Sequence, residues 1–182
     1  QEALGYDFID STFLMLTDSQ VIDTEGEVFE FPLGESYANG WDLILRAAEA
    51  DWTPYGRIGL GPLGEVIRGV GIHASAGITF DLASLRDAHG AENISFFSAY
   101  AGEGSLQPTG TVNCHVVMTD GAGNVVASAS KGPFTDNAEF VELRIPAEAA
   151  FLTLAVGSNG DGIGNDHGVF GNAFLTRCSM LD

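Results

Sequence analysis

A glycine-rich loop near the C-terminal end of the chain carries the densest group of side chains that could bind a metal ion. It spans residues 158–168 with the sequence SNGDGIGNDHG. Its Asn and Asp side chains are Asn159, Asp161, Asn165 and Asp166. Carboxylate and amide oxygens on a flexible loop suit Ca²⁺, although Ile163 stands where an EF-hand needs a ligand. The alternative is a turn in which Asn, Asp and Gly occur because they tolerate left-handed backbone, and the local spacing leaves both open.

A histidine set among glycines and small residues is the second candidate. His73 lies in the run RGVGIHA, which comes directly before a strand-like stretch. An imidazole at this position can hydrogen-bond a ligand hydroxyl group or brace a loop. From this stretch alone, a buried histidine whose hydrogen bonds are made within the protein is favoured.

Several aromatic side chains fall at expected strand ends or in loops, where a ring could stack on the C–H face of a sugar. They are Trp41, Trp52, Tyr55, Tyr100 and Phe170. Phe170 combines this chemistry with polar neighbours, because it directly follows the loop that carries Asp166 and His167. Most of the five are nevertheless expected in the core, since a sandwich of this size must be filled by large side chains.

The chain shows no motif of a known catalytic machinery. It lacks GxSxG, HExxH, a P-loop and a nucleophile with an adjacent base. Carboxylates are abundant, but their spacing selects no pair as a glycosidase dyad, because separation in space decides that chemistry. We therefore expect no catalytic residues, and keep a glycoside hydrolase with an unrecognised dyad as a third alternative.

Two cysteines, Cys114 and Cys178, both fall in expected strands. Neither belongs to a CxxC pair, so the sequence supports no zinc or redox motif. A disulfide between them would stabilise the fold by roughly 4 kcal/mol in the chain-entropy model. Two buried free thiols are the alternative, and the sequence leaves both open.

Charge excludes two classes of partner. The 182 residues include 25 acidic and 7 basic ones, which gives a formal net charge of −18. Such a surface repels phosphate backbones and anionic lipid, so we expect no nucleic-acid partner. No apolar run approaches the ~18–20 residues of a membrane span, so no membrane insertion is expected.

The elements that must position these residues are mostly short strands. Alternating or apolar runs predict strands over 27–31, 76–82, 94–101, 111–118, 125–127, 140–145, 151–156 and 173–178. The sequence TDGAGN over 119–124 is typical of a hairpin turn. Helical spacing allows a short helix over 41–50, with a strand as its alternative, and another over 83–89 that ends at Gly90. Together these patterns predict a single all-β domain, an antiparallel β-sandwich with at most a short helix.

Two stretches together resemble the NPCBM domain, a carbohydrate-binding module family related to carbohydrate-binding module family 51. The first is GVGIHASAGITFDL, which ends at Leu82, and the second is GDGIGNDHGVFGNAFL over 160–175. They occur in the order that the family has. The resemblance covers residues 60–178 well, so we expect an NPCBM-like core there, with strands in 1–59 completing one domain over 1–182.

The resemblance implies a galactose-binding-like sandwich of jelly-roll type and gives the candidate residues roles. The ligand contacts would come from the motif residues His73, Asp166, His167 and Phe170. The aromatic side chains of Trp52 and Tyr55 are added to this set as further candidates. The calcium ligands would be Asn159, Asp161, Asp166 and Asn172. Phe170 stands where many members have Trp, and Asn172 where many have Asp. The first departure weakens the ring on which a sugar would typically stack. The second removes one carboxylate from the typical metal site.

The sequence therefore predicts a non-catalytic, lectin-like module that binds galactose-type glycans, with Ca²⁺ as the expected cofactor. The resemblance implies a secreted or cell-surface location of the bacterial type, within a larger multidomain protein. A neutral glycan is favoured over an acidic one, because the surface is itself strongly acidic. The main alternative is an extracellular adhesive module that binds another protein.

Overall fold

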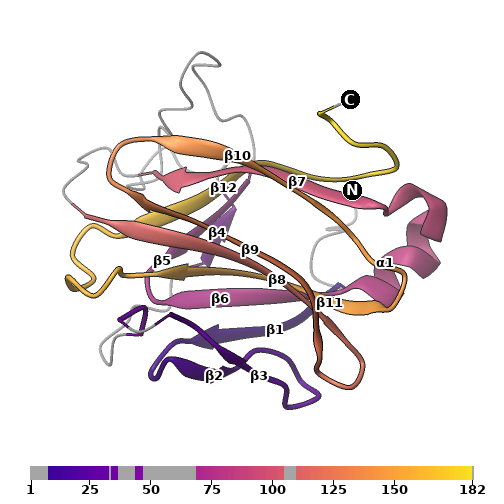
Figure 1. The fold of residues 1–182 in the computed structure, drawn as a ribbon, viewed down its shortest axis with the longest axis horizontal. Coiled ribbons are helices and arrows are strands. Elements are labelled where there is room, and N and C mark those ends of the chain that lie inside the picture. Colours follow the sequence, from indigo (N-terminus) through magenta and orange to yellow (C-terminus); the bar gives the residue numbers. More distant parts are fainter. Residues whose placement is uncertain (1–7, 33, 37–43, 47–68, 105–109, 182) are drawn as a thin grey trace.

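The computed structural model describes residues 8–32, 34–36, 44–46, 69–104 and 110–181, and these form a β-sandwich with a short helix at one end (Figure 1). Its strands are β1 (Ile9–Leu14), β2 (Ser19–Val21), β3 (Val28–Glu30), β4 (Ile44–Arg46), β5 (Gly69–His73), β6 (Ala76–Asp81), β7 (Phe96–Glu103), β8 (Val112–Asp120), β9 (Val125–Phe134), β10 (Ala138–Arg144), β11 (Ala149–Gly157) and β12 (His167–Thr176). The helical elements are α1 (Leu82–His89) and the 3₁₀ turn η3 (Ala91–Asn93). Neither described helix has the length and apolar character to cross a membrane.

Two antiparallel sheets of five strands make the two layers. The first sheet has the order β1-β6-β11-β8-β9, and the second has the order β10-β7-β12-β5-β4. The β2–β3 hairpin forms a small sheet of its own. All strand pairs among the described residues are antiparallel, so the predicted all-β antiparallel sandwich is confirmed.

Two apolar clusters pack against the first sheet, one on each of its faces. The main core lies between the sheets and includes Val116 of β8, Leu154 of β11 and Phe170 of β12. A smaller cluster joins Phe31 and its neighbours to Val117 of β8. Successive strand residues point to opposite faces, so Val116 and Val117 belong to different clusters. The central strands of the first sheet are therefore apolar on both faces.

Local sequence signals explain the turn and the helix that were predicted. In the β8–β9 turn, the Asp120 carboxylate accepts hydrogen bonds from the backbone N–H groups of Ala122 and Asn124, both at 2.9 Å. At the start of α1, the Asp81 carboxylate accepts one from Ser84 N at 3.0 Å. The helix ends at Gly90, whose φ of 86° favours glycine.

Other sequence-based expectations need correction. Within the range 41–50, residues Ile44–Arg46 form β4 and pair with β5, so the strand alternative, and not the helix, is confirmed there. The rest of that range lies outside the described residues. The strand expected over 173–178 is the end of the longer β12, which starts at His167. Tertiary pairing, rather than local pattern, determines these strands.

The two cysteines are free thiols, as in the second alternative, but only one of them is buried as that alternative expected. Cys114 is buried in the main core, where burial raises the pKa of its thiol to about 12. Cys178 is exposed, beyond the end of β12. The structure therefore contradicts the Cys114–Cys178 disulfide.

Candidate functional site

The two motif stretches meet at one end of the sandwich. His73, at the end of β5, stands directly opposite His167, at the start of β12, in the pairing of these strands. The Ala74 N–H then donates to the Asp166 carbonyl oxygen at 2.9 Å. Figure 1 shows the loop before β12, in gold, at the opposite end of the molecule from α1. The antiparallel register thus joins residues that are far apart in the sequence.

The two histidines form a buried, uncharged pair. Their ring centroids are 4.8 Å apart and the rings are nearly perpendicular. The Nδ1–H of His73 donates to the Ala74 carbonyl oxygen at 2.7 Å. Burial lowers the pKa of His167 to about 4, with a further contribution from His73, and burial also lowers the pKa of His73. At neutral pH both rings are therefore neutral and suited to hydrogen bonding with uncharged groups.

Asp166 is a buried carboxylate, and one of its two oxygens accepts a hydrogen bond. Its side chain is 1% exposed, and Oδ1 accepts a hydrogen bond from Thr111 N at 3.0 Å. Oδ2 is buried without a hydrogen-bond partner among the described residues. Burial raises the pKa of Asp166 to about 7, and the charge of Asp161 adds to the rise, although the Thr111 bond opposes it. The carboxyl group is thus held close to its titration point at neutral pH.

The loop before Asp166 presents polar side chains to solvent. Asn159, Asp161 and Asn165 are exposed. Asn159 and Asn165 adopt φ values of 53° and 66°, in the left-handed region that Asn tolerates. The turn explanation of the Asn and Gly content is therefore satisfied, and the Asp161 side chain is exposed to solvent in this loop.

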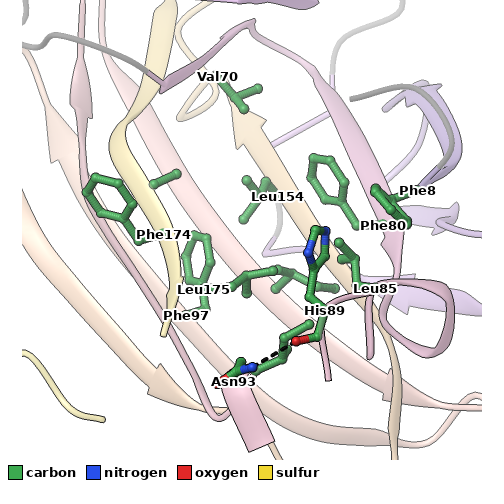
Figure 2. A pocket seen from close by; sticks show the side chains of 13 residues that line it. Phe8, Val70, Phe80, Leu85, His89, Asn93, Phe97, Leu154, Phe174 and Leu175 are labelled. Atoms are coloured by element: carbon green, nitrogen blue, oxygen red, sulfur yellow. Dashed lines mark hydrogen bonds between the residues drawn. The ribbon is translucent and has the colours of Figure 1, made fainter. Parts of the chain in front are cut away.

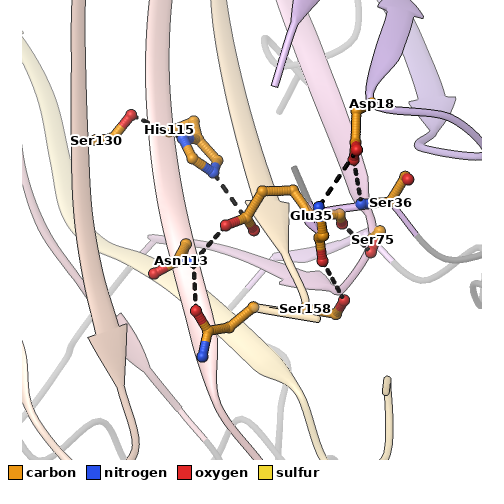
Figure 3. A network of polar contacts seen from close by, with 10 residues as sticks. Asp18, Glu35, Ser36, Ser75, Asn113, His115, Ser130 and Ser158 are labelled. Carbon is orange, nitrogen blue, oxygen red and sulfur yellow. Dashed lines mark hydrogen bonds and ion pairs between the residues drawn. The ribbon is translucent and has the colours of Figure 1, made fainter. Parts of the chain in front are cut away.

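Sequence reasoning missed Glu35, which lies beside this loop (Figure 3). It is 3% exposed, and its carboxylate accepts a hydrogen bond from Asn113 Nδ2. Its Oε2 lies 3.6 Å from His115 Nε2. No local sequence pattern marks Glu35 as buried, because its partners come from distant strands.

Two of the sequence-predicted site residues lie elsewhere. Phe170 is fully buried in the main core, so its predicted role as a sugar-stacking ring is wrong. Asn172 is six residues after Asp166, and a strand rises about 3.3 Å per residue, so it cannot join the same calcium site. Trp52 and Tyr55 lie outside the described residues.

The proposed metal ligands are only partly brought together. Asn159 Oδ1 accepts a hydrogen bond from Asn113 Nδ2 at 3.1 Å, which turns it toward Glu35. Asp161 is close enough to Asp166 to raise its pKa. Within the part of the chain that the structure describes, no group of three His, Cys, Asp or Glu side chains is placed to hold a metal ion.

A separate pocket of about 630 Å³ opens near α1, and Figure 2 shows Phe80, Leu154 and Phe97 around it. Its polar lining residues, His89 and Asn93, are joined by a bond from Asn93 Nδ2 to the His89 carbonyl oxygen at 2.8 Å. The other lining side chains are apolar, which does not suit a sugar with hydroxyl groups all around its ring. The loop end remains the better candidate site.

Comparison with known proteins gives one family and several similar folds. The NPCBM/NEW2 domain model matches residues 32–176. The CBM51 module of GH95 from Clostridium perfringens, solved with methyl-galactose, has 24% identity and a TM-score of 0.57, over 75% of this chain and 90% of that one. No curated protein is similar enough to count as a match.

Two further structures share the fold across nearly the whole chain. CBM51-2 with the INT domains of ZmpB from Clostridium perfringens, solved with GlcNAc, has 14% identity and a TM-score of 0.55, over 92% of this chain and 40% of that one. The tandem CBM51 modules of Sp3GH98 from Streptococcus pneumoniae have 14% identity and a TM-score of 0.53, over 93% and 48%. This chain thus spans less than half the length of either. With a family model matched over most of its length, from 32 to 176, and both motif stretches joined at one end of a galactose-binding-like sandwich, the chain belongs to the NPCBM/NEW2 domain family.

Proposed function

We propose that this domain is a non-catalytic carbohydrate-binding module that recognises neutral, galactose-type glycans at the loop end. The observation that carries the proposal is the joining of the two family motifs by the His73–His167 pair, in a domain of the NPCBM/NEW2 family. A structure similar to this chain was solved with methyl-galactose, which supports the choice of sugar. We further propose that the domain belongs to a secreted bacterial protein with additional domains.

The chemistry of the site fits an uncharged ligand. The exposed Asn159, Asp161 and Asn165 offer amide and carboxylate groups to sugar hydroxyls. Beneath them, His73 and His167 are buried and neutral, so no fixed positive charge invites an anion. The formal charge of −18 further disfavours an acidic polysaccharide. Binding at such an exposed surface is expected to be weak for a single site.

A glycan array that includes galactose- and GlcNAc-terminated oligosaccharides tests the proposal. We expect signals on galactose-type glycans and a loss of about tenfold in affinity for Asp161→Ala, because this side chain is exposed in the loop. Asp87→Ala, an exposed aspartate on α1 at the other end, is the matched control and should bind like the parent protein. An array with no signal would favour the protein-binding module, and cleavage of an oligosaccharide would favour the hydrolase.

We also propose a Ca²⁺ ion at this loop, held by Asp161 and Asp166 with loop oxygens completing the shell. The buried Oδ2 of Asp166 has no hydrogen-bond partner among the described residues, and a cation would satisfy it. A cation would also relieve the repulsion between Asp161 and Asp166. Asn172 is not part of this proposal.

Melting temperature in Ca²⁺ and in EDTA tests the ion. We expect Ca²⁺ at about 100 times its dissociation constant to add about 2.7 kcal/mol to the unfolding free energy, and Mg²⁺ to add less. Asp161→Asn should remove most of the difference, since it takes away one of two charges. Equal melting temperatures in Ca²⁺ and EDTA would contradict the proposal.

A further inference from the structure

We propose that Glu35 is a positioning residue of the sugar site, which fixes the 158–166 loop against the turn that follows His73. The inference rests on the proposed function, because it assigns the site's geometry to a residue that touches no sugar. The segment around Glu35 would then help to form the site, although neither motif of the family resemblance includes it.

The backbone of Glu35 contacts both parts of the site. Its carbonyl oxygen accepts a hydrogen bond from Ser75 Oγ at 2.6 Å, and Ser75 lies in the turn after His73. The same oxygen accepts one from Ser158 N at 3.4 Å, at the first residue of the loop. Figure 3 shows Ser75 and Ser158 both next to the backbone of Glu35. One carbonyl group therefore joins the β5–β6 turn to the loop.

The side chain of Glu35 makes a second connection to the same loop. Its carboxylate accepts from Asn113 Nδ2, and this amide also donates to Asn159 Oδ1 at 3.1 Å. On its other side, His115 lies 3.6 Å away and its Nδ1 is 2.8 Å from Ser130 Oγ. The buried carboxylate is thus tied to β8, and through Asn113 to the exposed Asn159.

Glycines make room for these contacts. A Cβ atom on Gly157 would lie 1.6 Å from Glu35 Oε2, so any larger residue would displace the carboxylate. Gly34 has a φ of 93°, and a Cβ there would lie 3.4 Å from Gly160 Cα in the loop. The segment itself is held from behind, because Asp18 accepts from Gly34 N at 3.3 Å and from Ser36 N at 3.0 Å.

The cost of burying Glu35 supports a role beyond packing. A carboxylate that is 3% exposed loses most of its hydration, and such groups stay buried only when partners hold them. An apolar residue at this position would avoid that cost, but it could not engage Asn113. Oε1 accepts the Asn113 hydrogen bond, while Oε2 is buried without a hydrogen-bond partner among the described residues, so the contact that offsets part of the cost is the one that leads to the loop.

Hydrogen exchange of the loop amides, measured together with sugar affinity, tests the proposal. Glu35→Ala should speed exchange in the 158–166 loop about tenfold and weaken galactose binding about tenfold. Glu35→Gln keeps an acceptor oxygen for Asn113 and should retain most of both properties. The control is Arg86→Ala, which removes bonds of 2.5 Å and 2.9 Å from α1 to the Ala149 and Pro146 carbonyl oxygens, far from the loop. It should lower the melting temperature without changing loop exchange or affinity.

The result that would overturn the proposal is unchanged loop exchange in Glu35→Ala, or an equal change in Arg86→Ala at the same loss of melting temperature. If Glu35→Ala does not fold, Asn113→Ala provides the same comparison, since it removes the bonds to both Glu35 and Asn159. If the parent protein binds no sugar, the proposed function fails, while loop exchange still decides whether Glu35 positions the loop.

Discussion

Replacing Phe170 by alanine is expected to lower the free energy of unfolding by about 3–5 kcal/mol. The side chain is 0% exposed and lies in the main core, on the central strand β12 between β5 and β7. Its removal leaves a cavity that the surrounding strands cannot close completely. For a domain of this size each kcal/mol corresponds to roughly 2–4 °C, so the melting temperature should fall by about 10 °C.

The matched control is Phe174→Ala, on the same strand but 50% exposed. It should cost only about 1 kcal/mol, since the ring is already half in water. A sugar-stacking role for Phe170 predicts a different pattern, in which Phe170→Ala keeps its melting temperature and loses affinity. Measuring both by thermal unfolding and titration with galactose decides whether Phe170 serves the fold or the ligand.

Asp166→Asn, measured in EDTA, is expected to gain stability relative to the parent protein as the pH rises from 4 to 7. Burial raises the pKa of Asp166 from 3.8 to about 7, so across this range the folded state holds a proton that the unfolded state has lost. Stability contributed by the neutral carboxyl group is present at low pH and lost toward pH 7, by at most roughly 4 kcal/mol. Asn is uncharged throughout and avoids that loss.

The titration of His167 changes stability with pH in the opposite direction, so its contribution must be separated from that of Asp166. Burial lowers its pKa from 6.5 to about 4, so its contribution is present above pH 6.5 and lost as the pH falls toward 4. The lowered pKa of His73 acts in the same direction. Both histidines are present in the parent and in Asp166→Asn, so the difference in melting temperature between the two proteins reports mainly on Asp166.

Asp120→Asn provides a control of opposite sign. Hydrogen bonds from Asn124 and from the Ala122 backbone lower the pKa of Asp120 in the β8–β9 turn. Its stabilisation is present above the unfolded-state pKa and lost as the pH falls, so Asp120→Asn should be least stable relative to the parent at pH 7. A constant difference across pH for Asp166→Asn, or one that follows Asp120→Asn, would show that the buried carboxyl group does not titrate as described.

The fold was predictable where short-range chemistry determines it. The TDGAGN turn gives the β8–β9 hairpin, and Asp81 with Gly90 sets the limits of α1. The strand β5 was missed because glycines at 69 and 71 break any alternating pattern. Those glycines are explained only by pairing, since a Cβ on Gly69 would lie 2.3 Å from the Phe170 carbonyl oxygen.

The site was predictable only in part, for a related reason. The motif residues His73, Asp166 and His167 were singled out and do lie together. Phe170 was misplaced because a loop-adjacent aromatic has the same local sequence whether its strand continues into the core or not. Glu35 was missed because its burial depends on Ser75, Asn113 and Ser158, which are between 40 and 123 positions away.

The position of β1 bears on where this domain can be cut. It lies before residue 32, where the family match begins, yet it covers one side of β6 from the Ile9–Phe80 pair to the Leu14–Ala76 pair. A chain trimmed to the matched range would leave β6 as an open edge and uncover Val117 on the neighbouring face. Open edges beside apolar surface promote self-association between chains. Solubility would therefore be lost before sugar recognition, and the smallest soluble unit begins upstream of the family match.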